Sequence, residues 1–153
     1  MDKEYTCCIT GHRDIPVGRT PYIQEELHKE LMMAIQRGYT HFISGFASGV
    51  DLIFAEIVTT LKKKYPITLE AAIPYPGRMN TPDKSFQRLI KECDMVKIHT
   101  EHYSKGCYTV RNHYMIDNST LVIAVYDGRK TGGTAGTIRY AYQEGCNVRE
   151  IKL

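Results

Sequence analysis

The stretch LVIAVYDGRKTGGTAGT, residues 121–137, joins an apolar run to a segment of helical spacing. Residues 121–126 read as a buried strand, and residues 134–144 read as a helix that stops before Gly145. Between them stand Gly132 and Gly133, with Gly136 one turn further on. Glycines at a strand-to-helix junction have two readings: they leave room for a phosphate, or they only allow the chain to turn.

The same alternation of strands and helices runs along the whole chain. Apolar runs predict strands at 5–10, 40–44, 67–73, 94–99, 121–126 and 148–153. Helical spacing predicts helices at 21–37, 48–64, from Thr81 onward, at 110–118 and at 134–144. The pattern predicts a single α/β domain over residues 1–153, with a mostly parallel sheet and helices on both faces in three layers. Ligands bind such sheets at the carboxyl ends of the strands, so we expect one edge to carry Gly11, Gly45, Pro74 and Gly132.

Composition narrows the functional classes. A length of 153 residues with 42% hydrophobic and 24% charged residues suits one globular domain. The net charge of +3 suits an anionic small ligand and is too weak to argue for nucleic acid on its own. No secretion signal or membrane span is evident, which predicts a cytoplasmic protein without a membrane partner. The five cysteines lack CxxC spacing, so we expect reduced thiols, no metal and no cofactor.

The loops after the first and third strands carry candidate ligand contacts. Gly11 lets the backbone turn closely, and Arg13 offers a fork suited to phosphate or carboxylate, although a surface turn explains both equally well. His12 is either an acid–base group or a hydrogen-bonding residue. In PYPGR, residues 74–78, a stiff turn carries Tyr75 and Arg78, which either clamp a base or belong to a rigid loop.

The loop after the second strand, SGFASGVD at residues 44–51, is unusually rich in small residues. A helix that begins near its middle would present free amides and a positive dipole end to an anion. Asp51 falls in the first turn, where it caps the helix or binds ribose hydroxyls. Five small residues are more than a cap needs, which favours a ligand site; they are Ser44, Gly45, Ala47, Ser48 and Gly49.

The glycine loop itself is neither GxGxxG nor a Walker loop, which needs GxxxxGK[ST]. It is similar to a GGxGT-type phosphate loop, in which glycines let the backbone approach the ligand. Thr134 and Thr137 can then donate hydroxyls. Arg111 and Asn112 lie near the start of the preceding helix.

Two motifs carry a resemblance to a known superfamily. ISGFASGVD, residues 43–51, resembles the SGxAxGxD signature of DNA-processing proteins of the DprA/Smf type. Residues 110–137 resemble the region of the LOG nucleotide hydrolases in which an RK pair precedes PGGxGTxxE. Together they are similar to the SLOG superfamily, a Rossmann-like fold, and the whole chain resembles its small bacterial and phage YpsA/YoqJ-like branch. The resemblance implies that a nucleotide or nucleotide-derived ligand binds at the strand carboxyl ends, and this fold often pairs through helices into homodimers.

The chain also departs from the LOG pattern. Arg111 matches the arginine that the LOG enzymes use in N-glycosidic bond cleavage, which makes it the candidate catalytic residue, but Asn112 replaces the neighbouring lysine. The glycine loop has one extra residue. Tyr140 stands three positions after Thr137, where the catalytic glutamate is expected. A tyrosine with an ordinary pKa near 10 cannot replace a carboxylate.

Three functions compete on this basis. The leading hypothesis is binding or sensing of a nucleotide ligand. The alternative is a nucleotide N-glycosidase of the LOG type, in which another acid, Asp51 or Asp117, replaces the glutamate. A second alternative is a DprA-like binder of single-stranded DNA, which calls for a more basic face and exposed stacking aromatics.

Overall fold

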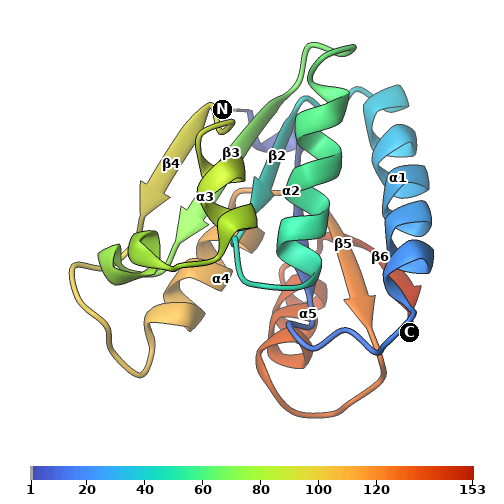
Figure 1. Ribbon diagram of the computed structural model, residues 1–153. Coiled ribbons are helices and arrows are strands. Elements are labelled where there is room, and N and C mark those ends of the chain that lie inside the picture. The colour runs from blue at the N-terminus through green and yellow to red at the C-terminus, as the bar shows by residue number, and fades with distance from the viewer. Residues whose placement is uncertain (1) are drawn as a thin grey trace.

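The structure, a computed structural model described here for residues 2–153, is built on one six-stranded sheet (Figure 1). All strands are parallel, in the order β4-β3-β2-β1-β5-β6. Their bounds are β1 Thr6–Gly11, β2 His41–Ser44, β3 Thr68–Ile73, β4 Met95–Ile98, β5 Leu121–Tyr126 and β6 Asn147–Lys152. The prediction of a parallel sheet is confirmed.

Five α-helices cover the two faces of the sheet. They are α1 Thr20–Gln36, α2 Val50–Leu61, α3 Lys84–Ile90, α4 Cys107–Asp117 and α5 Gly133–Gln143. Helices α1, α2 and α3 pack on one face over a large apolar core, and α4 and α5 pack on the other over a smaller one (Figure 1). The three-layer, Rossmann-like α/β architecture predicted from the sequence is therefore confirmed. No helix in residues 2–153 combines the length and apolar composition needed to cross a membrane.

Helix starts differ from the predicted ones for local reasons. Helix α2 begins at Val50, two residues late, because Gly49 has a positive φ of 83° and forms its N-cap. Helix α3 begins at Lys84 because the Asp83 carboxylate accepts hydrogen bonds from the first-turn amides and caps it there. Helix α4 begins three residues early, at Cys107, whose fully buried side chain anchors the first turn. Two short 3-10 helices, Lys3–Tyr5 and Pro76–Asn80, were not predicted.

The order of the strands places a switch point beside β1. The chain moves outward from β1 through β2 and β3 to β4, and α4 then returns it to β5 on the other side of β1. Helices leave the carboxyl edge of the sheet in opposite directions here, which opens a crevice between β1 and β5. Gly11 ends β1 at this edge, Gly45 and Pro74 directly follow β2 and β3 there, and Gly132 lies in the loop after β5, as expected.

Candidate functional site

A cavity of about 300 Å³ lies at the switch point, on the carboxyl edge of the sheet. This volume is at the lower end of the range of small-molecule sites. Its walls are the end of β1, the loop before α2, the inner face of α4 and the loop that enters α5. The candidate residues that line it are Gly11, His12, Arg13, Ala47, Asp51, Arg111, Asn112, Gly132, Gly133, Thr134 and Thr137.

Other candidates do not line the cavity, namely Ser44, Gly45, Ser48, Gly49, Tyr75, Arg78 and Gly136. The small residues before α2 instead allow close packing. A Cβ atom on Gly45 would lie 2.7 Å from Nη1 of Arg111, and one on Gly49 would lie 2.6 Å from the carbonyl oxygen of Arg13. The Ser44 hydroxyl donates to the Asp51 carbonyl at 2.9 Å. Ser44, Gly45 and Gly49 therefore serve the packing of residues that line the cavity, namely Asp51, Arg111 and Arg13.

Arg111 brings a buried positive charge to the cavity wall. Its Nη1 donates to the carbonyl oxygens of Gly45 at 2.6 Å and Ala72 at 3.1 Å, and its Nε donates to Oδ1 of Asn112 at 2.8 Å. Burial lowers the pKa of the guanidinium, which nonetheless stays protonated at any physiological pH. Asn112, in the place of the expected lysine, thus helps to fix the orientation of Arg111.

Asp51 supplies a buried carboxyl group to the same wall. Oδ2 accepts a hydrogen bond from the amide of Ala47 at 3.2 Å, so the side chain also holds the loop before α2. Burial raises the pKa of Asp51 to about 6, although the charges of Arg111 and Arg13 and the Ala47 hydrogen bond oppose the rise. A group that titrates near neutral pH inside a cavity is typical of functional sites.

The start of α5 opens onto the cavity without a side-chain cap. Gly132, with a positive φ of 102°, is the N-cap. In the first helical hydrogen bond, the Gly136 amide donates to the Gly132 carbonyl at 3.0 Å. The amides ahead of Gly136 carry the positive end of the helix dipole. The Thr137 hydroxyl donates to the Gly133 carbonyl at 2.8 Å, so it is engaged within the helix. Helices α2 and α4 also begin at glycine caps, Gly49 and Gly106.

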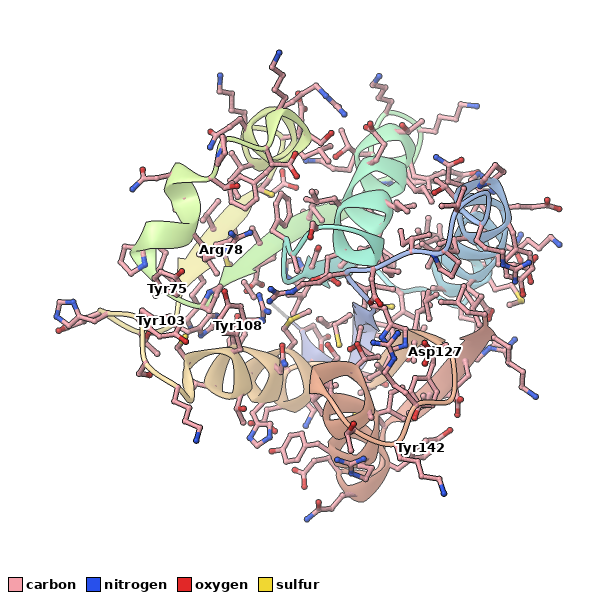
Figure 2. The ribbon with its side chains drawn as sticks, turned by 60° about the horizontal axis from the view of Figure 1, so that its bottom comes forward. Tyr75, Arg78, Tyr103, Tyr108, Asp127 and Tyr142 are labelled. Atoms are coloured by element: carbon pink, nitrogen blue, oxygen red, sulfur yellow. The ribbon has the colours of Figure 1, made fainter. Side chains whose placement is uncertain are left out.

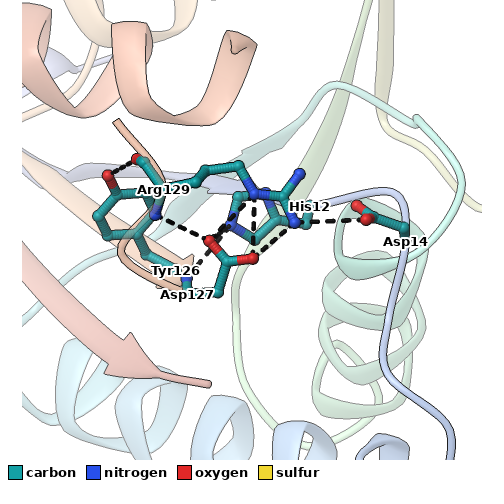
Figure 3. A network of polar contacts seen from close by, with 5 residues as sticks. All are labelled: His12, Asp14, Tyr126, Asp127 and Arg129. Atoms are coloured by element: carbon teal, nitrogen blue, oxygen red, sulfur yellow. Dashed lines mark hydrogen bonds and ion pairs between the residues drawn. The ribbon is translucent and has the colours of Figure 1, made fainter. Parts of the chain in front are cut away.

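A charged network ties the loop after β5 to the loop after β1 (Figure 3). The Asp127 amide donates to Nε2 of the buried His12 at 3.2 Å, and the Asp127 carboxylate pairs with Arg129 at 2.5 Å. Arg129 also reaches Asp14 at 3.3 Å, and its carbonyl accepts a hydrogen bond from the Tyr126 hydroxyl. Hydrogen bonds from Arg129 lower the pKa of both carboxylates. Arg129 and Asp14 line the cavity, so this network forms its outer rim.

Aromatic rings form the opposite rim. The guanidinium carbons of Arg13 and Arg111 lie 4.9 and 5.5 Å from the centre of the Tyr108 ring, in cation–π geometry. Tyr75 meets Tyr108 and Tyr103 edge to face, with ring centres 6.3 and 5.4 Å apart. Figure 2, which brings the carboxyl edge of the sheet forward, shows the three tyrosines gathered on one side and Asp127 on the other.

Tyr140, at the expected position of the catalytic glutamate, does not line the cavity. Its ring stacks on His113 with centres 3.8 Å apart, and its hydroxyl donates to Asp117 at 2.6 Å. These contacts hold the side chain between α5 and α4. Asp117, considered above as a substitute acid, is bound to Tyr140 and is likewise absent from the cavity wall.

Sequence reasoning missed four residues of the rims, namely Asp14, Tyr108, Asp127 and Arg129. A signal existed for the DGR segment, residues 127–129, because charged residues that directly follow a predicted strand end at the ligand edge of a parallel sheet. Tyr108 carried no such signal, because α4 was predicted to begin two residues after it.

The family model described as the YspA SLOG family, YpsA, matches residues 7–151. The chain belongs to this family. Among its relatives is the uncharacterised SPbeta prophage-derived protein YoqJ of Bacillus subtilis, which is 34% identical over 119 residues, 65% of this chain and 68% of that protein. A UPF0398 protein of Listeria innocua is 26% identical over 137 residues, 81% of this chain and 76% of that one.

Solved structures of other proteins show the same fold. DNA processing protein A of Streptococcus pneumoniae superimposes with a TM-score of 0.73 at 16% identity, over 97% of this chain and 50% of that one. DNA processing protein A of Helicobacter pylori, studied for its single-stranded DNA binding mode, gives 0.71 at 21% identity, over 97% of this chain and 65% of that one. The SLOG chain described here thus spans half to two thirds of these proteins.

Proposed function

We propose that the protein binds a nucleotide or a nucleotide-derived ligand, with the phosphate against the start of α5. The observation that carries the proposal is the uncapped glycine start of α5 at a cavity that also holds the buried cation Arg111. A Cβ atom on Gly132 or Gly133 would meet no atom within 4 Å, so open space adjoins the backbone there. Membership of the SLOG family supports the same ligand class.

Binding is favoured over N-glycoside hydrolysis by the position of the carboxylates. Cleavage through an oxocarbenium-like centre needs a carboxylate near the sugar, and Tyr140 and Asp117 are turned toward each other instead. Asp14 lines the cavity but is paired with Arg129, which leaves Asp51 as the remaining carboxylate among the cavity-lining residues. Asp51 is therefore the acid that a hydrolase function would require.

The experiment that tests binding compares two valines on the same helix. In Gly133→Val the added side chain adjoins the cavity, whereas Gly136→Val places the same side chain outside the lining. Calorimetric titration with AMP should show at least a tenfold weaker affinity for Gly133→Val and an unchanged affinity for Gly136→Val, with both variants folded. Equal affinities of the wild type and Gly133→Val would contradict the proposed phosphate position.

A second measurement separates binding from catalysis. Incubation of the wild type with AMP should release no free adenine, as followed by chromatography. Release of adenine that disappears in Arg111→Ala would instead establish the hydrolase function.

A further inference from the structure

The tyrosines beside the cavity form a surface that the phosphate site leaves unexplained. The tyrosine shelf, as we name it, consists of Tyr75, Tyr103 and Tyr108, which come from the turn after β3, the loop after β4 and the first turn of α4. Tyr103 keeps 67% of its surface exposed, which is unusual for an aromatic side chain packed against another. Tyr108 belongs both to the shelf and to the cavity wall, so the two are continuous.

The shelf is held in place by backbone contacts. The loop that carries Tyr103 continues the β3–β4 ladder, since the amides of His99 and Thr100 donate to the carbonyls of Ile73 and Pro74 at 2.9 and 3.1 Å. The Thr100 hydroxyl also donates to the Pro74 carbonyl, at 2.7 Å. The start of the loop that carries Tyr103 is therefore tied to the residue before Tyr75 in the absence of a ligand, which reduces the entropy lost on binding.

Cations surround the shelf. Arg13 and Arg111 lie against Tyr108, and Arg78 comes from the same turn as Tyr75 (Figure 2). An aromatic surface flanked by arginines and joined to an anion-binding helix start matches one ligand chemistry, a flat base linked to a phosphate. An apolar protein segment would offer these guanidinium groups no anion to pair with.

We propose that the tyrosine shelf is the base-binding half of the site, where the base of a mononucleotide stacks while its phosphate lies at the start of α5. The inference rests on the proposed function and extends it from the phosphate to the base. Purines should bind better than pyrimidines, because their larger rings stack over more of the shelf.

The test compares a nucleotide with its base-free counterpart. AMP, UMP and ribose 5-phosphate are titrated calorimetrically into the wild type, Tyr103→Leu, Tyr108→Leu and Tyr108→Phe, each checked for folding by circular dichroism. Tyr142→Leu is the matched control, because Tyr142 is 54% exposed on α5 and lies away from the shelf (Figure 2).

We expect the wild type to bind AMP more tightly than UMP, and UMP more tightly than ribose 5-phosphate. Tyr103→Leu and Tyr108→Leu should each weaken AMP binding about tenfold, within the range measured for loss of one base–aromatic stack. Tyr103→Leu should leave ribose 5-phosphate binding unchanged, because Tyr103 does not line the cavity. Tyr108→Phe, which keeps the ring, should lose less AMP affinity than Tyr108→Leu, and Tyr142→Leu should bind AMP like the wild type.

The failures of the two proposals are distinguishable. If AMP binding is lost in Gly133→Val but unaffected by the Tyr103 and Tyr108 substitutions, the shelf is refuted and the phosphate site stands. If the wild type binds neither AMP nor ribose 5-phosphate, the proposed function itself fails. If the leucine variants lose binding of a thymidine oligonucleotide but keep AMP, the shelf serves single-stranded nucleic acid and the mononucleotide assignment is overturned.

Discussion

Replacing Asp51 with asparagine should stabilise the protein at neutral pH. Burial raises the pKa of this carboxyl group from 3.8 to about 6 in the folded protein. Between these values the folded state binds more protons than the unfolded state, so stability falls as the pH rises from about 4 to about 6. Above pH 6, the buried charge of Asp51 therefore lowers the free energy of unfolding by about 3 kcal/mol. Asparagine still accepts a hydrogen bond from the Ala47 amide and carries no charge, so it removes this penalty.

Urea unfolding at pH 8 and at pH 4 measures the effect. Asp51→Asn should gain about 2–3 kcal/mol in free energy of unfolding over the wild type at pH 8, and the difference should nearly vanish at pH 4. Asp127→Asn is the control of opposite sign: Arg129 lowers the pKa of Asp127, so the stabilisation from this carboxylate is present above its ordinary pKa and fades in acid. An Asp51→Asn variant that is no more stable than the wild type at pH 8 would refute the buried-carboxylate reasoning.

Three further predictions follow from the same site. AMP binding near pH 6.5 should be accompanied by proton uptake, because a bound phosphate favours protonated Asp51; calorimetry in two buffers of different ionisation enthalpy should detect it, and Asp51→Asn should abolish it. Gly45→Ala should cost about 1–3 kcal/mol of stability in urea unfolding, because its Cβ would lie 2.7 Å from Nη1 of Arg111, while Gly133→Ala should cost much less. Arg111→Gln should raise the pKa of Asp51 further, as read from carboxyl NMR shifts; an unchanged pKa would show that the Arg111 charge does not act on Asp51.

The fold could be predicted because its signals are local and repeated. The central strands are apolar runs, as in β5, and most helices are framed by residues with a clear steric role, such as the glycine that ends the first predicted helix, Gly38. Parallel pairing then follows from strand–helix alternation. The edge that carries the candidate site could be predicted for the same reason, since in a parallel sheet every strand ends at one edge.

The detailed roles of the loop residues could not be predicted, because they depend on contacts between distant segments. Gly45 looks like part of a phosphate loop, but its small size makes room for Arg111, which lies 66 positions later in the chain. Thr137 looks like a free hydroxyl donor, but its hydroxyl bonds to its own helix. Tyr108 has no sequence signal at all, since its importance comes from the two arginines that lie against it.

Two opposite charges lie in one cavity, and the proposed nucleotide ligand has to satisfy both of them. Arg111 and the start of α5 attract an anion, whereas ionised Asp51 repels it, so a bare phosphate gains least from this cavity when Asp51 is charged. A ribose placed between the phosphate and the tyrosine shelf would present hydroxyl groups, which a carboxylate accepts as hydrogen-bond donors. In the proposed binding mode Asp51 contacts the sugar, with which a protonated or an ionised carboxyl group can share hydrogen bonds, while Arg111 and the start of α5 hold the phosphate. If the proposal holds, a nucleotide therefore contacts both groups at once, which neither inorganic phosphate nor a free base can do.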